Sequence, residues 1–256
     1  MTATLSALYS YPVKGFSPEP LERAVLETSG YFPGDRLYAI ENGDSGFDPV
    51  APRHQPKTKY LMLMRDEALA RLRTRYDDAT ATLTVEAGGE TVVAKLDTDV
   101  GRATLEDLMR RQLPDALRGE LRVLAAPEHT GYRFTDSKIG YVSLINLASV
   151  RAVEEYVDAP VDPLRFRGNL HVEGLAPWAE LEMVGRVLEA PSGLRLKVTK
   201  RTVRCAATNV DPISGARDLD IPWAIDAHLG HRDCGVYAEV IAGGALAVGD
   251  TLTAIG

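Results

Sequence analysis

Short segments in which apolar and polar side chains alternate recur along the whole chain, and they limit its possible folds more than any other feature. A period of two places every second side chain on the same face, which is typical of a β-strand buried on one side. The run ATLTVEAGGETVVAKL contains two such segments joined through Gly88 and Gly89, and it predicts a β-hairpin. The other predicted strands are TLSALYSYPV, residues 21–26, residues 36–40, LRVLAA, YVSLIN, RFRGNLHVEG, MVGRVLEA, LRLKVTK, GVYAEVI and TLTAIG.

Helical patterns are fewer and shorter. The apolar run KYLMLM predicts a short buried strand, and a helix is expected after it at residues 65–76. Thr104 is expected to cap a helix that ends at Pro114. The helices predicted in the rest of the chain are residues 105–112, 148–157 and 222–228.

The balance of these elements points to one fold class. Strands outnumber helices and do not alternate regularly with them, which argues against a doubly wound parallel sheet. The pattern predicts a mainly β fold with a few short helices (α+β), built as a barrel or a sandwich. The chain is long enough for one large domain or two small ones, and a boundary is expected at residues 118–120.

Composition excludes several classes of partner. The net charge of −7 argues against nucleic acid, because neutralising phosphates needs a basic face. No apolar run approaches the roughly 20 residues that span a bilayer, and the N-terminus lacks a secretory signal. The protein is therefore expected in the cytoplasm, without a membrane partner. Its two cysteines, Cys205 and Cys234, are too few for a disulfide scaffold and are expected to be free thiols.

Familiar catalytic motifs are missing from the sequence. No nucleotide-binding glycine loop is present, and GYVSLIN contains no nucleophile elbow. The five histidines form neither an HExxH motif nor a paired Cys/His zinc pattern, and they are His54, His129, His171, His228 and His231.

Cys205 is the residue most expected to carry chemistry. Lys200, Arg201 and Arg204 precede it in KRTVRCAATNVDP, and a nearby guanidinium stabilises a thiolate. A thiolate at a strand end or in a loop is an accessible soft metal ligand or a nucleophile. The competing interpretation is a small, buried and inert side chain, and this interpretation is favoured for Cys234.

Basic residues recur at the ends of predicted strands. An arginine in such a position can hold a phosphate or a carboxylate through two parallel hydrogen bonds. Solvated surface charge is the alternative, since most lysines and arginines are exposed. The residues concerned are Lys14, Arg36, Arg53, Arg165, Arg167 and Arg204.

Five motifs in a fixed order carry a resemblance to a known family. They are YPVKG, GDRLYAI, RFRGNLHVEG, RCAATNVDP and CGVYAEVIAGGALAVGD, and they extend over nearly the whole chain. The chain resembles the MOSC proteins that carry a MOSC N-terminal β-domain, a group that includes the mitochondrial amidoxime-reducing components and their bacterial relatives. The resemblance implies a MOSC N-terminal-like β domain at residues 1–118 and a MOSC-like β-barrel at residues 119–256.

The same resemblance implies a molybdenum cofactor, in which molybdopterin and one protein cysteine bind the metal. Cys205 matches that cysteine, as metal ligand and catalytic residue. Gly15 stands where amidoxime-reducing relatives have a serine, so only its backbone N–H could bind the cofactor. The positions that match cofactor-binding residues are Lys14, Gly15, Arg36, Asp136, Ser137, Arg167, Asn169, Arg204 and Tyr237.

The implied activity is an oxidoreductase that reduces the N–O bond of small N-hydroxylated compounds. Two cysteines cannot hold an iron–sulfur cluster, so electrons are expected from a separate donor protein of the ferredoxin, flavodoxin or cytochrome type. Two alternatives remain open: a non-enzymatic carrier of the same cofactor, and a sulfur carrier that uses a persulfide on Cys205. Cys234 receives no role.

Overall fold

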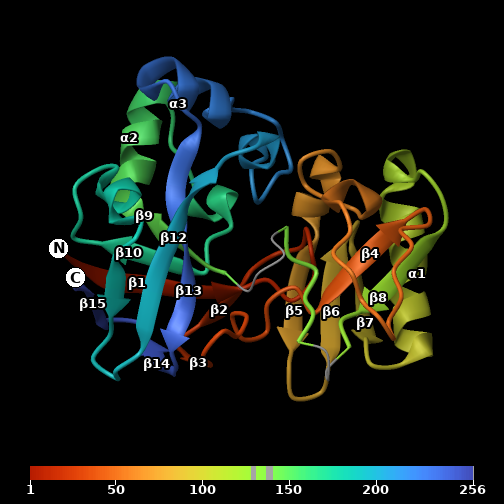
Figure 1. Cartoon of the computed structure of the whole chain (residues 1–256). Coiled ribbons are helices and arrows are strands. Elements are labelled where there is room, and N and C mark those ends of the chain that lie inside the picture. Colours follow the sequence, from red (N-terminus) through yellow and green to blue (C-terminus); the bar gives the residue numbers. More distant parts are fainter. Residues whose placement is uncertain (128–130, 137–140, 256) are drawn as a thin grey trace.

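A closed β-barrel and a second β-rich body beside it make up the structure, a computed structural model that describes residues 1–127, 131–136 and 141–255 (Figure 1). Seven strands close the barrel, because β10 pairs with both β9 and β1. In order around the barrel they are β1 (Thr2–Ser10), β10 (Leu170–Glu173), β9 (Val142–Asn146), β13 (Asp233–Ala242), β12 (Arg195–Val203), β11 (Val187–Glu189) and β15 (Thr251–Ile255). The predicted mainly β fold is confirmed.

The N-terminal strands share sheets with the C-terminal half of the chain. β1 pairs with β15 at its start and with β10 further along, and β2 (Glu19–Leu21) pairs with its end. β3 (Arg23–Leu26) pairs with β14 (Gly244–Ala247). The boundary expected at residues 118–120 stays a prediction. β1 belongs to the barrel, whereas Val13 and Phe16, which follow it, pack in the core of the second body.

The second body is built from residues between these strands and β9. A two-stranded sheet joins β4 (Tyr38–Asn42) to β8 (Leu121–Ala125), and α1 (Asp99–Gln112) packs on β8. A three-stranded sheet contains β5 (Arg73–Asp77), β6 (Thr82–Ala87) and β7 (Glu90–Lys95). The hairpin predicted through Gly88 and Gly89 is the β6–β7 pair.

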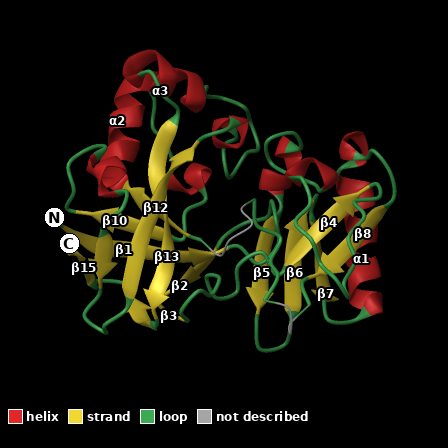
Figure 2. Ribbon diagram, viewed as in Figure 1, coloured by secondary structure: helices red, strands yellow, loops and turns green. Residues whose placement is uncertain are grey.

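Two α-helices lie at one end of the barrel (Figure 2). They are α2 (Leu147–Val157), capped by Asn146, and α3 (Ile221–Leu229), capped by Asp220. Tyr156 stacks on His228 between them, with ring centroids 4.1 Å apart. The short 3-10 helices are η1 (Lys57–Lys59), η2 (Glu67–Arg71), η3 (Pro114–Ala116), η5 (Pro163–Phe166), η6 (Ala179–Met183) and η7 (Ala206–Asn209).

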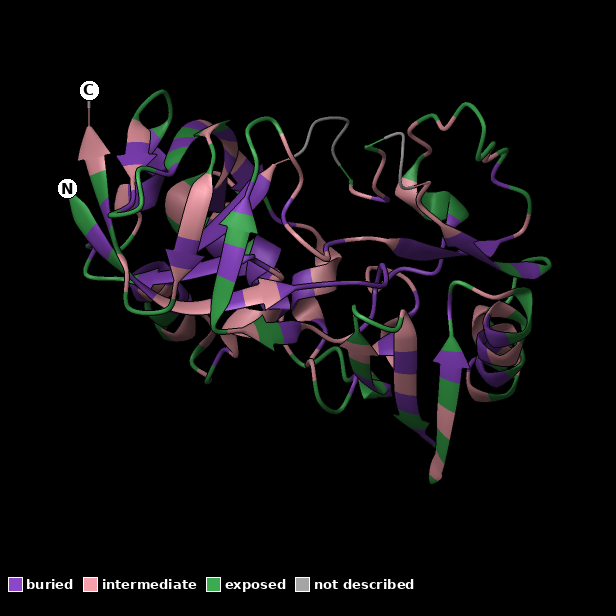
Figure 3. Ribbon diagram, turned by 90° about the horizontal axis from the view of Figure 1, so that it is seen from below, coloured by how far each residue is buried: buried purple, intermediate pink, exposed green. Residues whose placement is uncertain are grey.

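The hydrophobic core follows the alternation read from the sequence. Along β1 and β12, buried positions alternate with exposed or half-exposed ones over most of the strand (Figure 3). Leu5, Leu196 and Val198 are among the fully buried barrel residues. The second body has its own core around Leu83 and Leu105. No described helix is long and apolar enough to cross a membrane.

Four local predictions were wrong. The run KYLMLM forms turns and not a strand, and the helix expected at residues 65–76 is the short η2 followed by β5. The first α-helix begins six residues earlier than expected, because Thr98 and not Thr104 caps it, accepting a hydrogen bond from the Gly101 N–H. Arg36 lies outside β4, since its backbone is left-handed with φ of 50°.

Candidate functional site

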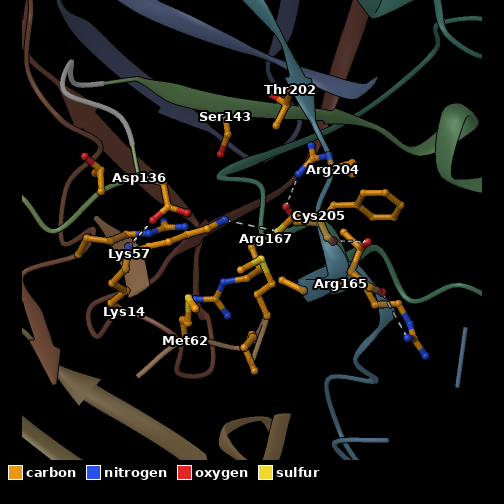
Figure 4. Close-up of a pocket in the computed structure, with 18 of the residues that line it drawn as sticks. Lys14, Lys57, Met62, Asp136, Ser143, Arg165, Arg167, Thr202, Arg204 and Cys205 are labelled. Carbon is orange, nitrogen blue, oxygen red and sulfur yellow. Dashed lines mark hydrogen bonds and ion pairs between the residues drawn. The ribbon is translucent and has the colours of Figure 1, made fainter. Parts of the chain in front are cut away.

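A cavity of about 280 Å³ is lined by residues from both the barrel and the second body (Figure 4). The segments YPVKG and DRLY lie along one another at its edge. The Arg36 N–H donates to the Tyr11 carbonyl at 2.8 Å, and the Lys14 N–H donates to the Tyr38 carbonyl at 2.9 Å. Six basic and two acidic side chains line the cavity, so its field favours an anionic ligand in a protein of net charge −7.

The cavity brings together nine of the ten residues that the sequence analysis placed at one site. These are Lys14, Gly15, Arg36, Asp136, Arg167, Asn169, Arg204, Cys205 and Tyr237. Ser137 lies outside the described residues. Their proximity is a finding of the structure, and their roles toward a cofactor stay predictions. Of the other basic residues singled out, Arg165 lines the cavity and Arg53 does not.

Cys205 lies two residues after the end of β12 and is the N-cap of the short helix η7. The Thr208 backbone N–H and hydroxyl both donate to its carbonyl at 3.0 Å, which fixes the loop that presents the thiol. The side chain is partly exposed toward the cavity. Lys57 Nζ donates to its sulfur at 3.7 Å. Lys57 was not identified from the sequence, because it lies 148 residues away from Cys205.

Two arginines share the ring of the buried Tyr11. The guanidinium carbons of Arg36 and Arg167 lie 4.6 and 4.3 Å from its centroid. Both arginines have left-handed backbones, with φ of 50° and 53°, a conformation that costs a non-glycine residue about 1–3 kcal/mol. Strain of this kind persists only where the surrounding structure enforces it, so both side chains are held in place.

Arg167 has an unsatisfied donor in the cavity. Its Nη1 donates to the Phe16 carbonyl at 2.8 Å, but its Nη2 is buried without a partner among the described residues. Burial, and then repulsion by Arg36, lower the pKa of Arg167 to about 10. An anion placed against Nη2 would accept the unused hydrogen bond and would also compensate the positive charge of the buried guanidinium.

Lys14 is buried and bound on two sides. Its Nζ donates to the Phe134 carbonyl at 3.0 Å and forms an ion pair with Asp136. Burial, reinforced by Arg36 and Arg167, lowers the pKa of Lys14 despite the neighbouring carboxylate. Burial opposes the charge of Asp136 as well, but Lys14 and then Lys57 hold the pKa of that carboxyl below its ordinary value.

Asp35 and Asn169 form the support behind the arginines. Both Asp35 carboxylate oxygens accept from Arg36 Nη1 at 2.5 Å, and Oδ1 also accepts from the Tyr11 N–H at 2.8 Å. Asn169 Nδ2 donates to Asp35 Oδ1 at 3.3 Å, and its Oδ1 accepts from the Ser143 hydroxyl at 2.8 Å. Asn169 and Asp35 therefore hold Arg36 in place through hydrogen bonds, and the sequence analysis did not single out Asp35 within the GDR motif.

Arg204 and Arg165 hold the loop that carries Cys205. Arg204 Nε donates to the Cys234 carbonyl at 2.6 Å and Nη1 to the Phe166 carbonyl at 2.9 Å. Arg165 forms a two-point ion pair with Asp218, with both distances 2.8 Å, and a third contact to Asp211 at 3.1 Å. These N–H groups of Arg204 already donate to backbone carbonyls of the protein. The contact of Arg204 with a cofactor therefore stays a prediction.

Two protein-family models match the chain. The model described as the MOSC N-terminal beta barrel domain matches residues 2–114, and the model of the MOSC domain matches residues 132–253. The chain belongs to the MOSC domain proteins. Cys205 and the barrel strands that surround it fall within the MOSC match, whereas Lys14, Arg36 and Lys57 fall within the N-terminal match. The family is associated with the molybdenum cofactor.

Similar solved structures include two bacterial proteins. The YUAD protein from Bacillus subtilis is 15% identical over 98% of this chain and 94% of that chain, with a TM-score of 0.47. YiiM from Geobacillus stearothermophilus is 19% identical over 45% of this chain and 54% of that chain, with a TM-score of 0.35. Both scores are too low to establish a shared fold. A search of the curated proteins finds no match.

The donor set of this MOSC cavity fits a metal that arrives with its own ligands. Among the described residues, no three His, Cys, Asp or Glu side chains are grouped closely enough to hold a metal ion. The lining instead contains one partly exposed thiol, that of Cys205, and three buried polar atoms without a partner among the described groups: Arg165 Nε, Arg167 Nη2 and the Thr202 hydroxyl. A pterin dithiolene cofactor with a phosphate would need one further thiolate and cationic donors.

The two thiols of the MOSC barrel are expected to differ sharply in reactivity. At about pH 8, iodoacetamide should modify Cys205 in the native protein and leave the fully buried Cys234 intact until a denaturant is added. Burial raises the pKa of Cys234 from 9.0 to about 12, against the opposing charge of Arg204. The folded state therefore keeps this proton where the unfolded state loses it, so stability falls as the pH rises from 9 to 12.

Mass spectrometry of the alkylated peptides checks this expectation. Equal modification of both cysteines in the native protein would contradict it.

Proposed function

We propose that this protein binds a molybdenum cofactor through Cys205 and reduces the N–O bond of small N-hydroxylated compounds. The reaction consumes two electrons and two protons and gives the amine or amidine and water. The observation that carries the proposal is the cavity itself: one accessible cysteine sulfur lies in a pocket that also holds an unpartnered, buried guanidinium donor on Arg167.

The chain's own residues would bind and orient the cofactor. Cys205 would supply the protein ligand to the metal, and Arg167 Nη2 would donate to an anionic oxygen. Arg36 is held ready by Asp35, and Lys14 by Asp136, so these cations meet the cofactor without reorganising. When bound, the cofactor supplies a metal that takes up and releases two electrons.

The protein must receive its electrons from elsewhere. Among the described residues the thiols Cys205 and Cys234 are both free, and Cys234 is buried and protonated. A separate donor protein of the ferredoxin, flavodoxin or cytochrome type is therefore part of the proposal.

Metal content tests the proposal directly. Wild-type protein made in a host that produces molybdopterin is expected to contain close to one molybdenum per chain. The molybdenum content of Cys205→Ser is expected to be at least about tenfold lower. Cys234→Ala is the matched control, since that thiol packs in the apolar cluster with α2 and α3 and does not line the cavity. Metal-free wild-type protein, beside a fully loaded control molybdoenzyme from the same host, would rule the proposal out.

The same samples separate the two alternative functions. A sulfur carrier would show an added sulfur on Cys205 and no molybdenum, and the ammonium of Lys57, 3.7 Å from the sulfur, would suit a persulfide anion. A non-enzymatic cofactor carrier would load molybdenum but never reduce an N-hydroxylated substrate in the presence of a chemical reductant.

A further inference from the structure

Among the described cations that line the cavity, all except Lys57 have at least one oxygen partner within the fold. Those committed by hydrogen bonds or ion pairs are Lys14 with Asp136, Arg36 with Asp35, Arg165 with Asp218, Arg167 with the Phe16 carbonyl, and Arg204 with the Cys234 and Phe166 carbonyls. Lys57 has no ion pair or hydrogen bond to a carboxylate or carbonyl within the described ranges. Among the described residues, its ammonium donates only to the Cys205 sulfur, at 3.7 Å.

Lys57 reaches this position from the second body. It begins η1, and its half-buried side chain extends through the cavity toward Cys205 (Figure 4). Asp136 is the nearby acidic group, and it is already paired with Lys14. A molecule that approaches the sulfur therefore meets an ammonium whose charge is not neutralised by a bonded carboxylate.

We infer that Lys57 is a specificity-determining residue that favours anionic molecules at Cys205. On the proposed function, on which this substrate class rests, the preferred substrates are N-hydroxylated compounds that carry a carboxylate, rather than neutral ones. The Lys57 ammonium lies 3.7 Å from the Cys205 sulfur, and a charge about 4 Å from a reacting thiolate changes its preference for an anionic reagent severalfold even when solvent screens it.

Paired alkylating reagents measure this field without any cofactor. Iodoacetate is anionic and iodoacetamide is neutral, and both attack the same thiolate, so the ratio of their rates at Cys205 cancels the fraction of thiol that is ionised. The experiment uses the full chain from a host that makes no molybdopterin. Lys57→Met is expected to lower the iodoacetate-to-iodoacetamide ratio about fivefold.

Two further variants control for other effects. Lys57→Arg keeps the positive charge and should retain most of the wild-type ratio. Lys59→Met removes an exposed lysine from the same helix, which donates to the Asp44 carbonyl at 3.1 Å and does not line the cavity, and should leave the ratio unchanged. An unchanged ratio in Lys57→Met, or an equal fall in Lys59→Met, would overturn the inference.

Loaded protein tests the substrate class. The ratio of kcat/KM for 4-carboxybenzamidoxime over benzamidoxime is expected to fall about fivefold in Lys57→Met and to recover in Lys57→Arg. An unchanged ratio would overturn the substrate preference. Failure to load molybdenum would instead count against the proposed function, while the alkylation ratio would still decide the role of Lys57.

Discussion

Replacing Gly235 by alanine is expected to lower the free energy of unfolding by about 4 kcal/mol, because strain and a steric clash act together. Gly235 lies in β13 with φ of +75°, a conformation that a β-carbon disfavours. A β-carbon there would lie 2.4 Å from the Leu144 carbonyl oxygen and 2.7 Å from Ile145 Cδ1. The clash is with the backbone of β9, the strand paired with β13, so the barrel would have to open locally.

Gly249→Ala is the matched control for this variant. Gly249 also has a positive φ, of +93°, but a β-carbon there would meet no heavy atom within 4 Å. Its replacement should cost only the conformational strain, about 1–2 kcal/mol. Urea denaturation followed by circular dichroism measures both. Equal losses in the two variants would show that the contact with β9 carries no energy.

A second readout connects Gly235 to the site. The new β-carbon would also lie 3.0 Å from Arg204 Nη2, and Arg204 precedes Cys205. The rate at which iodoacetamide alkylates Cys205 is therefore expected to differ from wild type in Gly235→Ala and to equal it in Gly249→Ala.

Alternation predicted the fold well wherever one face of a strand is buried. The strands of the barrel and the β6–β7 hairpin carry this pattern, and side-chain burial decides their position. The run KYLMLM failed because continuous apolar residues have no period. Leu61 and Met62 are buried by tertiary packing, and the segment makes only an isolated bridge to β4, in which Tyr60 lies opposite Glu41 and the Leu61 N–H donates to the Ile40 carbonyl at 2.9 Å. The start of α1 was predicted too late, at Thr104, and the turn that was missed contains Gly101, a residue of low helix propensity.

That glycine is required by packing and not by the helix. A β-carbon on Gly101 would lie 2.0 Å from the Lys95 carbonyl oxygen, at the end of β7. Thr98 caps the helix just before it, and local propensity gives no sign of this close approach.

The candidate site was predicted as a set of residue types and not as a network. Short motifs named residues such as Lys14, Arg36 and Cys205, which the cavity brings together. Lys57 could not be found in this way, because only the packing of the second body against the barrel brings it to the sulfur. The motifs also do not distinguish an arginine with an unpartnered N–H group, such as Arg167, from one whose N–H groups bond within the fold, such as Arg204.

Asp35→Ala is expected to lower the free energy of unfolding by about 3–5 kcal/mol, since it leaves a buried cation without its partner. The Asp35 side chain is 6% exposed, and it accepts hydrogen bonds from Arg36, the Tyr11 N–H and Asn169. Burial by itself would lower the pKa of Arg36, but the neighbouring Asp35 carboxylate outweighs this effect, so the pKa of Arg36 is raised. Asp48→Ala is the control, because that exposed carboxylate accepts only a local hydrogen bond from the Val50 N–H, and its loss should cost under about 0.5 kcal/mol.

A double-mutant cycle separates the unpaired charge from the lost hydrogen bonds. If the cost of Asp35→Ala comes mainly from stranding Arg36, then adding Arg36→Met should cost nothing further and should restore part of the stability, with a coupling energy of about 2 kcal/mol. Strictly additive losses would mean that Asp35 stabilises Tyr11 and Asn169 and leaves Arg36 independent. Coupling would identify Asp35 as the group that holds Arg36 toward the cavity before any anion binds, since a positively charged pocket stays folded only while each buried cation keeps a partner.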